Sequence, residues 1–365
     1  MAVDFSRNVH GLLGLPFDVI DMAGAVRQVH DAAASRKPCF LTTPNLNFAI
    51  GCLTDAGFRN SVINSDLSVA DGMPLVWVAR LLGVPIRERV AGSTLFERLR
   101  SAPQPKIAVY LFGGPDGVAE AACRQLQQEQ RGVTCAGFES PGFGSLDDIS
   151  SDAILDRINA SNADFVLVAL GAKKGQAWIE RNRARLNAPV ISHLGAVVNF
   201  VAGSVSRAPV WMQRTGLEWL WRIKEEPALW RRYGADGMAL CSLLFTKILP
   251  YAVYLLLNIN KIKYLQDGSV EANSAATSYT LRLKGAWTQA NIAKLSAAFT
   301  QAAHAGTEIR LQLADVTYVD SAFVGQLMLL YGHQKRQGLR LILDTVPPPV
   351  RRVLTYSCAD YLCAN

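Results

Sequence analysis

The sequence has few of the patterns that mark secreted or metal-holding chains. Its seven cysteines are scattered, and none forms a C-x-x-C pair. No group of His, Cys and carboxylate residues has the spacing of metal ligands, and no Asp-x-Asp motif occurs. The segment from Met1 to Arg7 contains no apolar run of signal-peptide length. We therefore expect reduced thiols, no metal, no organic cofactor and a cytoplasmic protein.

The sequence also lacks the charge pattern of a nucleic-acid-binding protein, although its net charge is +7 and its pI is about 9.1. The basic residues gather in one segment, Arg207 to Arg232. No run alternates basic and aromatic residues as an RNA-binding sheet does. We expect no nucleic acid partner, and the arginines of this segment need another explanation.

A chain of 365 residues is long enough for two domains with separate cores. Strands such as Lys106 to Phe112 and Asp164 to Leu170 are nearly continuous apolar runs, and helical patterns follow them. Such runs are typical of parallel strands that are buried on both faces. The fold class expected is α/β, with a mostly parallel sheet first and a smaller α/β domain at 278–365, after a stretch of linker composition at 267–277.

The carboxylate of Asp71 is expected at the carboxyl edge of the parallel sheet, where α/β proteins usually place their catalytic residues. Asp71 and Gly72 follow an apolar run, and a helix is expected from Met73. Thr43 and Asn45 follow the preceding strand. Because the carboxyl ends of parallel strands meet at one edge, these side chains should gather there, and Asp71 is a candidate base. The alternative is that Asp-Gly is only a turn.

These motifs resemble those of a known family. Thr43-x-Asn45, Ala70-Asp71-Gly72 and Arg89-Val-Ala-Gly92 are similar to the signature of the WecG/TagA/CpsF glycosyltransferases, glycosyltransferase family 26, and the resemblance covers roughly residues 10 to 235. It implies a Rossmann-like domain that moves a sugar from a UDP-sugar to a lipid-linked acceptor. Asp71 would then be the general base, Thr43 and Asn45 would orient substrate hydroxyls, and Arg89 would stabilise the departing UDP.

The chain departs from the family pattern at three positions. Gly175 stands where the family has a sugar-contacting glutamine, and Gln176 follows where the family has Glu. Asn199 replaces an Asp. Gln176 and Asn199 are the substrate-binding candidates at these places, or donor choice differs. The rival hypothesis is a degenerate transferase domain that acts as a scaffold at the membrane. His193 fits a buried core residue better than a ligand.

The basic segment resembles the family's carboxyl-terminal appendage, which begins at about residue 204 in a domain of residues 1–235. Its arginines are candidates for holding the UDP diphosphate, because guanidinium groups can replace a metal ion there. The candidates are Arg207, Arg214, Arg222, Arg231 and Arg232. The alternatives are a solvated helix face, or a belt of arginine and tryptophan beside anionic lipid.

A glycine-rich turn, Gly113 to Gly117, joins an apolar strand to a helix and suggests phosphate binding, or only a tight turn. It also raises the possibility of a dinucleotide-dependent oxidoreductase. That function is disfavoured, because no acidic residue closes a following strand at the spacing that ribose recognition needs.

Residues 236–266 are strongly apolar, but Lys247 and Pro250 interrupt the run at 237–258. We favour helices that lie in the membrane surface or dock on protein over a helix that spans the bilayer. The segment 278–365 resembles a STAS domain through the phrase Leu313 to Gly325, in which Ala322 takes the place of a phosphorylatable residue. Asp320 and Ser321 are the possible regulatory residues, and a protein partner is expected at this domain.

Together these features predict an inverting, metal-independent glycosyltransferase at the cytoplasmic face of the cell membrane, associated peripherally. The donor would be UDP-linked N-acetylmannosamine, its uronic acid or glucose, and the acceptor a polyprenyl-diphosphate-linked sugar in cell-surface or exopolysaccharide biosynthesis. The STAS domain would serve regulation or assembly. The oligomeric state stays open, with a homo-oligomer among the options.

Overall fold

The computed structural model describes residues 3–103, 105–142, 144–262, 265–275 and 277–363. Its larger sheet has six strands in the order β4-β3-β8-β7-β5-β6, and every neighbouring pair is parallel. The strands are β3 (Cys39–Thr42), β4 (Leu67–Ser68), β5 (Ile107–Gly113), β6 (Val133–Glu139), β7 (Phe165–Ala169) and β8 (Val190–His193). The expected α/β class is confirmed.

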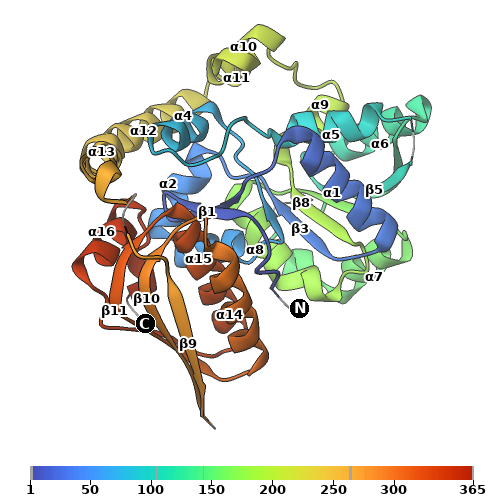
Figure 1. Cartoon of the computed structure of the whole chain (residues 1–365). Helices are drawn as coiled ribbons and strands as arrows, with labels where there is room; N and C mark the ends of the chain where they lie inside the picture. The colour runs from blue at the N-terminus through green and yellow to red at the C-terminus, as the bar shows by residue number, and fades with distance from the viewer. Residues whose placement is uncertain (1–2, 104, 143, 263–264, 276, 364–365) are drawn as a thin grey trace.

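Helices cover both faces of this sheet (Figure 1). One face packs against α1 (Met22–Ser35), α5 (Gly92–Ser101), α6 (Val118–Glu129) and α9 (Gly195–Val201). The other packs against α7 (Asp152–Ala160) and α8 (Ala172–Asn182). Every side chain of β7 is buried, as a strand covered on both faces requires. The remaining helices beside the sheet are α2 (Leu46–Thr54), α3 (Ala56–Ile63) and α4 (Met73–Leu81).

The chain reverses its winding direction in the middle of this sheet. The connection from β5 through α6 leads outward to β6, whereas the connection from β7 through α8 leads the opposite way to β8. Such a switch point opens a crevice at the carboxyl ends of the two strands, where α/β proteins bind their ligands. Gly113 and Gly114 lie there with φ of 99° and 91°, and Gly114 N donates to Ala169 O at 2.8 Å.

The second sheet has four strands in the order β12-β11-β10-β9. They are β9 (Ser269–Ser274), β10 (Ser278–Trp287), β11 (Glu308–Val319) and β12 (Leu341–Asp344), with helices α14 (Ile292–His304), α15 (Ser321–Arg336) and α16 (Pro348–Tyr356). The prediction of a linker at 267–277 is wrong for most of that stretch. Strand β9 pairs antiparallel with β10 along its whole length, because backbone groups form this ladder and polar side chains do not prevent it.

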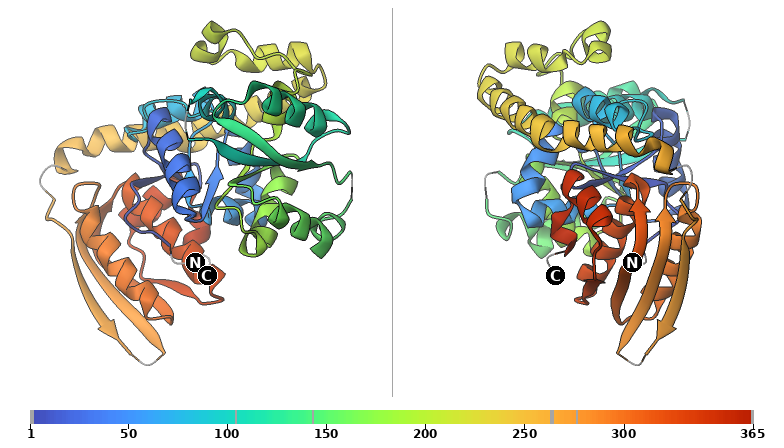
Figure 2. Two further views of the ribbon diagram at one scale, coloured as in Figure 1. Left: turned by 90° about the vertical axis from the view of Figure 1, so that its right-hand side faces the viewer. Right: turned by 60° about the vertical axis from the view of Figure 1, so that its left-hand side comes forward.

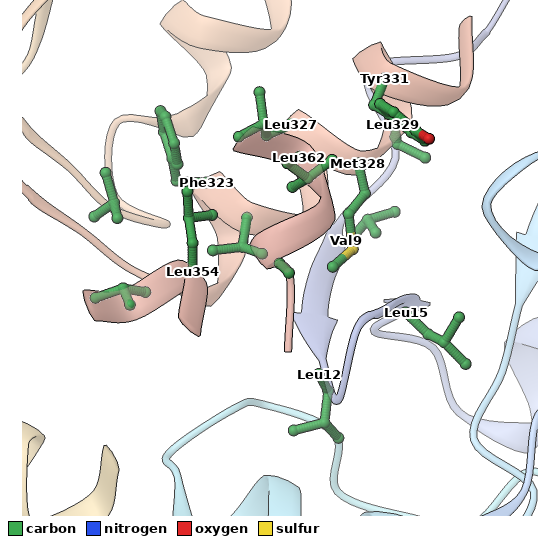
Figure 3. Close-up of a cluster of buried hydrophobic side chains, with 14 of the residues drawn as sticks. Val9, Leu12, Leu15, Phe323, Leu327, Met328, Leu329, Tyr331, Leu354 and Leu362 are labelled. Atoms are coloured by element: carbon green, nitrogen blue, oxygen red, sulfur yellow. The ribbon is translucent and has the colours of Figure 1, made fainter. Parts of the chain in front are cut away.

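A hairpin at the start of the chain lies between the two sheets. Strands β1 (Val9–Leu12) and β2 (Leu15–Asp18) pair antiparallel, and the turn uses Leu13 and Gly14 with positive φ. Side chains of the hairpin belong to the same hydrophobic core as those of α15 and the second sheet (Figure 3). The two parts of the chain therefore share one core.

The basic appendage continues into one long helix (Figure 2). Helices α10 (Val210–Thr215) and α11 (Glu218–Glu225) precede α12 (Leu229–Leu243), a π-helical turn at Leu244–Ile248 and α13 (Leu249–Ile262). The expected boundary between residues 235 and 236 therefore falls inside α12. The π-turn lies just before Pro250, which has no N–H to donate to the preceding turn.

The apolar part of this helix is long and apolar enough to cross a membrane by length and composition. One side of it nevertheless packs on the second domain, where Ile248, Tyr251 and Ala252 are buried and Tyr251 contacts Tyr356 of α16. Lys247 forms an ion pair with Asp360 at 3.8 Å. This contact matches the expectation of a docked helix better than that of a spanning one.

The cysteine prediction is wrong for two residues. Cys123 on α6 and Cys135 on β6 form a disulfide. Cys39 and Cys52 are free and buried, as expected, whereas the free thiol of Cys241 is exposed. The scattered spacing gave no sign of the pair, because a helix and the strand that follows it bring the two residues together.

Candidate active site

Asp71 lies at the carboxyl edge of the larger sheet, three residues beyond β4. Its backbone N–H donates to Pro44 O at 2.9 Å, which ties it to the loop after β3. Its Oδ2 accepts from Gly92 N at 3.1 Å, so the carboxylate meets the first residue of α5. The carboxylate is thus fixed at a helix amino terminus, where the helix dipole favours negative charge.

Thr43 and Asn45 lie in the same corner, as the sequence predicts. A Cβ on Gly92 would come within 3.1 Å of Thr43 Oγ1 and 2.4 Å of Leu194. Only glycine therefore lets the start of α5 come this close to Thr43 and Leu194. Asn45 is the N-cap of α2, where its Oδ1 accepts from Phe48 N at 3.1 Å. Its side chain also lies 3.7 Å from the Cβ position of Gly72. Asn45 therefore has a structural role beside any contact with substrate.

Arg89 joins Asp71 to the appendage. Its Nε lies 3.3 Å from Asp71 Oδ1, and its Nη2 lies 2.6 Å from Glu218 Oε2 on α11. The Arg89 side chain is only 16% exposed, and those of Asp71 and Glu218 are 22% exposed. The appendage thus supplies a second carboxylate to the same guanidinium. Sequence reasoning missed Glu218, because no local pattern tells that α11 folds over the loop of Asp71.

The turn between α10 and α11 sets the position of α11 over the loop of Asp71. Gly216 has a φ of 79°, and a Cβ there would come within 2.9 Å of Met73 and 3.1 Å of Trp77 on α4. Helix α4 begins directly after Asp71 and Gly72. The appendage therefore rests on the helix that starts at the site, and Gly216 permits the close contact.

The environment of Asp71 suits a base. Burial raises the pKa of the Asp71 carboxyl, and the negative charge of Glu218 acts in the same direction. The charge of Arg89 and the hydrogen bond from Gly92 N oppose this rise. A carboxylate with a raised pKa binds a proton more readily than an exposed one, as general-base catalysis requires.

Two further arginines lie near α9 and the amino terminus of α5. Arg207 Nη2 donates to Thr94 Oγ1 at 3.0 Å, within the first turn of α5. The guanidinium groups of Arg207 and Arg222 lie 5.9 and 5.8 Å from the centroid of the Phe200 ring. Asn199 precedes Phe200 on α9, and its carbonyl accepts from Ser204 N at 3.1 Å. Two arginines and a helix amino terminus here form a candidate anion site.

Two of the predicted arginines have a different placement. Arg231 and Arg232 are exposed on α12, and their described contacts are with Trp230 and Tyr233 of the same helix. Arg214 belongs to α10, but its side chain lies outside the described residues. No described contact joins Arg231 or Arg232 to Asp71, and the role of all three arginines in binding diphosphate stays a prediction.

Gln176 is buried in α8 at 1% exposure, and neither atom of its amide has a hydrogen-bond partner among the described residues. The neighbouring Gly175 leaves its space to the ring of His193, which a Cβ at that position would approach to 2.3 Å. Burial lowers the pKa of His193 to about 4, so its ring is neutral at physiological pH. The role of Gln176 with substrate stays a prediction.

A cavity of about 340 Å³ opens at the opposite edge of the sheet, next to the start of β3. Arg7, Asp66 and Arg336 are among its lining residues, and none of the predicted site residues is. Within the described ranges, no group of three or more His, Cys, Asp or Glu residues is arranged to hold a metal. The chemistry is better sought at Asp71, where charged side chains from several elements meet.

Asp320 and Ser321 lie at the start of α15. Asp320 is the N-cap and accepts from Ala322 N at 2.8 Å and Phe323 N at 3.1 Å. Ser321 Oγ lies 2.8 Å from His10 Nδ1 of the hairpin. Burial lowers the pKa of His10 to about 4. Ser321 thus lies at a contact with the first domain, whereas the described hydrogen bonds of Asp320 stay within the STAS domain.

Comparison with known proteins matches two regions of the chain. Residues 10–252 match the glycosyl transferase WecG/TagA/CpsF family, and residues 270–362 match the STAS domain of the Mlab type. An N-acetylglucosaminyldiphosphoundecaprenol N-acetyl-beta-D-mannosaminyltransferase of Bacillus spizizenii is 30% identical over 197 residues, which are 54% of this chain and 75% of the relative. The Staphylococcus aureus MW2 enzyme of the same name is 26% identical over 226 residues, or 61% and 86% of the two chains. The chain belongs to the WecG/TagA/CpsF family of glycosyl transferases and carries a STAS domain after the transferase domain.

Proposed function

We propose that this chain is an inverting, metal-independent transferase that moves a sugar from a UDP-sugar to a polyprenyl-diphosphate-linked acceptor. N-acetylmannosamine is the first candidate for the sugar, because the relatives are named for its transfer to a lipid-linked N-acetylglucosamine. The observation that carries the proposal is the carboxylate of Asp71, held by Gly92 N–H and Arg89 at the mouth of the sheet.

In the proposed reaction, Asp71 takes the proton of the acceptor hydroxyl while the hydroxyl oxygen attacks the anomeric carbon. The bond from that carbon to the UDP oxygen breaks, and UDP leaves with the electron pair. Attack from the side opposite to UDP inverts the anomeric configuration. Asp71 then passes its proton to water. A positioned base of this kind is worth about 10²- to 10⁴-fold in rate.

The leaving diphosphate needs positive charge. The switch point lies close to α9, since the Cβ position of Gly114 lies 3.8 Å from Val198. The guanidinium groups of Arg207 and Arg222 both lie near the ring of Phe200, which belongs to α9. Arg207 also contacts the first turn of α5. Guanidinium groups stay charged and bind phosphate oxygens through two N–H groups, as a substitute for a divalent ion.

Transfer assays with the full chain in detergent test this function. The acceptor is a short polyprenyl-diphosphate N-acetylglucosamine, and the donors are the UDP derivatives of N-acetylmannosamine, N-acetylmannosaminuronic acid and glucose. We expect UDP release and a lipid-linked disaccharide with at least one donor, at a rate that EDTA leaves unchanged. Loss of transfer in EDTA with rescue by Mn²⁺ would exclude the arginine role, and no UDP release with any donor would favour the scaffold hypothesis.

We further propose that the protein lies on the inner face of the cell membrane through an apolar surface next to the site. Exposed large side chains gather on α4, α10, α11, α12, the π-helical turn and α13, which lie along the upper side of Figure 1. They are Trp77, Leu81, Val210, Trp211, Trp219, Leu220, Trp230, Met238, Phe245, Leu249, Val253, Leu256 and Leu257. Tryptophan with nearby arginine suits the interface of an anionic membrane.

The double variant Leu256→Glu/Leu257→Glu should weaken binding to phosphatidylethanolamine/phosphatidylglycerol vesicles at least ~10-fold, because each fully buried leucine contributes ~1.5–3 kcal/mol. The wild-type residues are 69% and 75% exposed, so the fold should tolerate the change. Vesicle sedimentation measures the binding. The control Gln127→Glu/Gln128→Glu adds the same charge on α6 and should bind like wild type. Equal binding of all three proteins would refute this surface.

A further inference from the structure

The STAS domain presses its helix α15 against the transferase domain. Gly325 and Gly332 make this approach possible: a Cβ on Gly325 would lie 2.5 Å from Val9 O, and one on Gly332 would lie 2.7 Å from Ile63 of α3. Figure 3 shows side chains of α15 beside those of β1. Most of α15 is buried, so this helix is not a free surface for a protein partner.

A buried glutamine of α15 holds the start of the chain. Gln326 is 1% exposed, and its Nε2 donates to the carbonyl oxygens of Phe5 and Arg7, both at 3.1 Å. Because buried carbonyl groups require a donor, this contact fixes the backbone on which the Arg7 side chain stands.

The Arg7 side chain in turn contacts Asp18 of β2 and Ser65, which lies just before β4. Its Nε and Nη2 donate to the two oxygens of Asp18 at 3.0 and 2.6 Å, and its Nη1 donates to Ser65 O at 2.7 Å. Both charged side chains are only 9% exposed. A bidentate pair of this kind has one geometry, so it transmits a shift of the backbone rather than absorbing it.

Asp18 holds the strand that leads to Asp71. Its Oδ2 accepts from Ser68 N at 2.7 Å, within β4. Beyond Ser68, Val69 N donates to Thr42 O at 3.0 Å and Val90 N to Ala70 O at 2.9 Å. Asp71 is the next residue. Hydrogen bonds therefore connect α15 of the STAS domain to Ser68, and three residues of backbone lead from Ser68 to the candidate base.

We propose that the STAS domain acts on its own transferase domain, with Gln326, Arg7 and Asp18 as positioning residues that set the place of the Asp71 carboxylate. This inference rests on the proposed role of Asp71. It assigns to the STAS domain an internal partner, the β1–β2 hairpin, in addition to any external one. A change at the start of α15, where Ser321 meets His10, would alter turnover through the same contacts.

The variant Gln326→Leu tests the proposal, and α15 offers a matched control. Gln334 is also 1% exposed, and its Nε2 donates to Thr307 O at 2.9 Å and Arg340 O at 3.0 Å, both within the STAS domain. Each leucine variant removes two hydrogen bonds and leaves two backbone carbonyl groups without their donor. We expect similar losses of Tm from the two variants.

Only Gln326→Leu should change catalysis. Its kcat for sugar transfer should fall about tenfold with little change in KM for the UDP-sugar, because small displacements of a reacting group cost rate more than binding. Gln334→Leu should keep the kcat of the wild type. Equal kcat values in both variants at matched loss of Tm would overturn the proposal.

Hydrogen exchange gives a readout that needs no activity. Gln326→Leu should speed amide exchange over residues 65–71, and Gln334→Leu should leave that segment as in the wild type. If wild type shows no transfer but the exchange difference is present, the proposed reaction fails while the connection between the domains stands. If exchange at 65–71 is the same in all three proteins, the connection is refuted.

Discussion

The variant Asp71→Asn should remain folded and lose at least ~100-fold in kcat for sugar transfer, the lower end of the range for a positioned base. Asparagine has the same shape, and its Oδ1 can still accept from Gly92 N. It cannot take a proton from the acceptor hydroxyl. Initial rates of UDP release at saturating donor and acceptor measure the loss, and the Tm reports the fold.

A matched control is Asp55→Asn. Asp55 is the N-cap of α3 and accepts from Phe58 N at 2.9 Å, so this change also removes a carboxylate charge from a helix amino terminus. It should leave transfer close to wild type. If Asp71→Asn were as active as this control, Asp71 would have no part in the chemistry.

The variant Arg89→Ala should lower kcat/KM for the UDP-sugar by ~10²- to 10³-fold, as the loss of one group that stabilises developing negative charge does elsewhere. The guanidinium lies between the carboxylates of Asp71 and Glu218. Its removal leaves these two like charges facing each other and takes away a cation that we propose to stabilise the leaving UDP. Steady-state kinetics of UDP release measure the effect.

Arg89→Lys should have an intermediate rate, because an ammonium group keeps the charge and loses the fork that contacts both carboxylates. The control is Arg124→Ala, which removes an exposed arginine of α6 that pairs only with Glu120 in the described contacts, and it should keep wild-type kinetics. A rate for Arg89→Ala within twofold of this control would contradict the role of Arg89.

Local patterns predicted most of the fold. The continuous apolar runs gave β5 and β7, because those signals depend only on neighbours along the chain. Strand β9 was not predicted, because its side chains are polar and mostly exposed and only its pairing with β10 makes it a strand. The position of the β1–β2 hairpin against α15 depends on contacts between residues more than 300 positions apart.

The candidate site divides in the same way. Thr43 and Asp71 fall at the ends of predicted strands, and Arg89 belongs to a motif of the resembled family, so sequence reasoning brings them together. Glu218 comes from a segment that folds back over the site, and the sequence gives no measure of that return. The arginines of the appendage all belong to one basic segment, so the sequence does not distinguish them. In the structure, Arg207 contacts α5, whereas Arg231 is exposed on α12.

The pH dependence of kcat/KM for wild type and Glu218→Gln tests most directly whether Asp71 is the base. A base must be deprotonated in the free enzyme, so activity should fall as pH drops through its pKa. The charge of Glu218 raises the pKa of Asp71, so its removal lowers that pKa. The account predicts that the acid limb of the Glu218→Gln profile moves to lower pH; a limb that stays in place or moves to higher pH would contradict it.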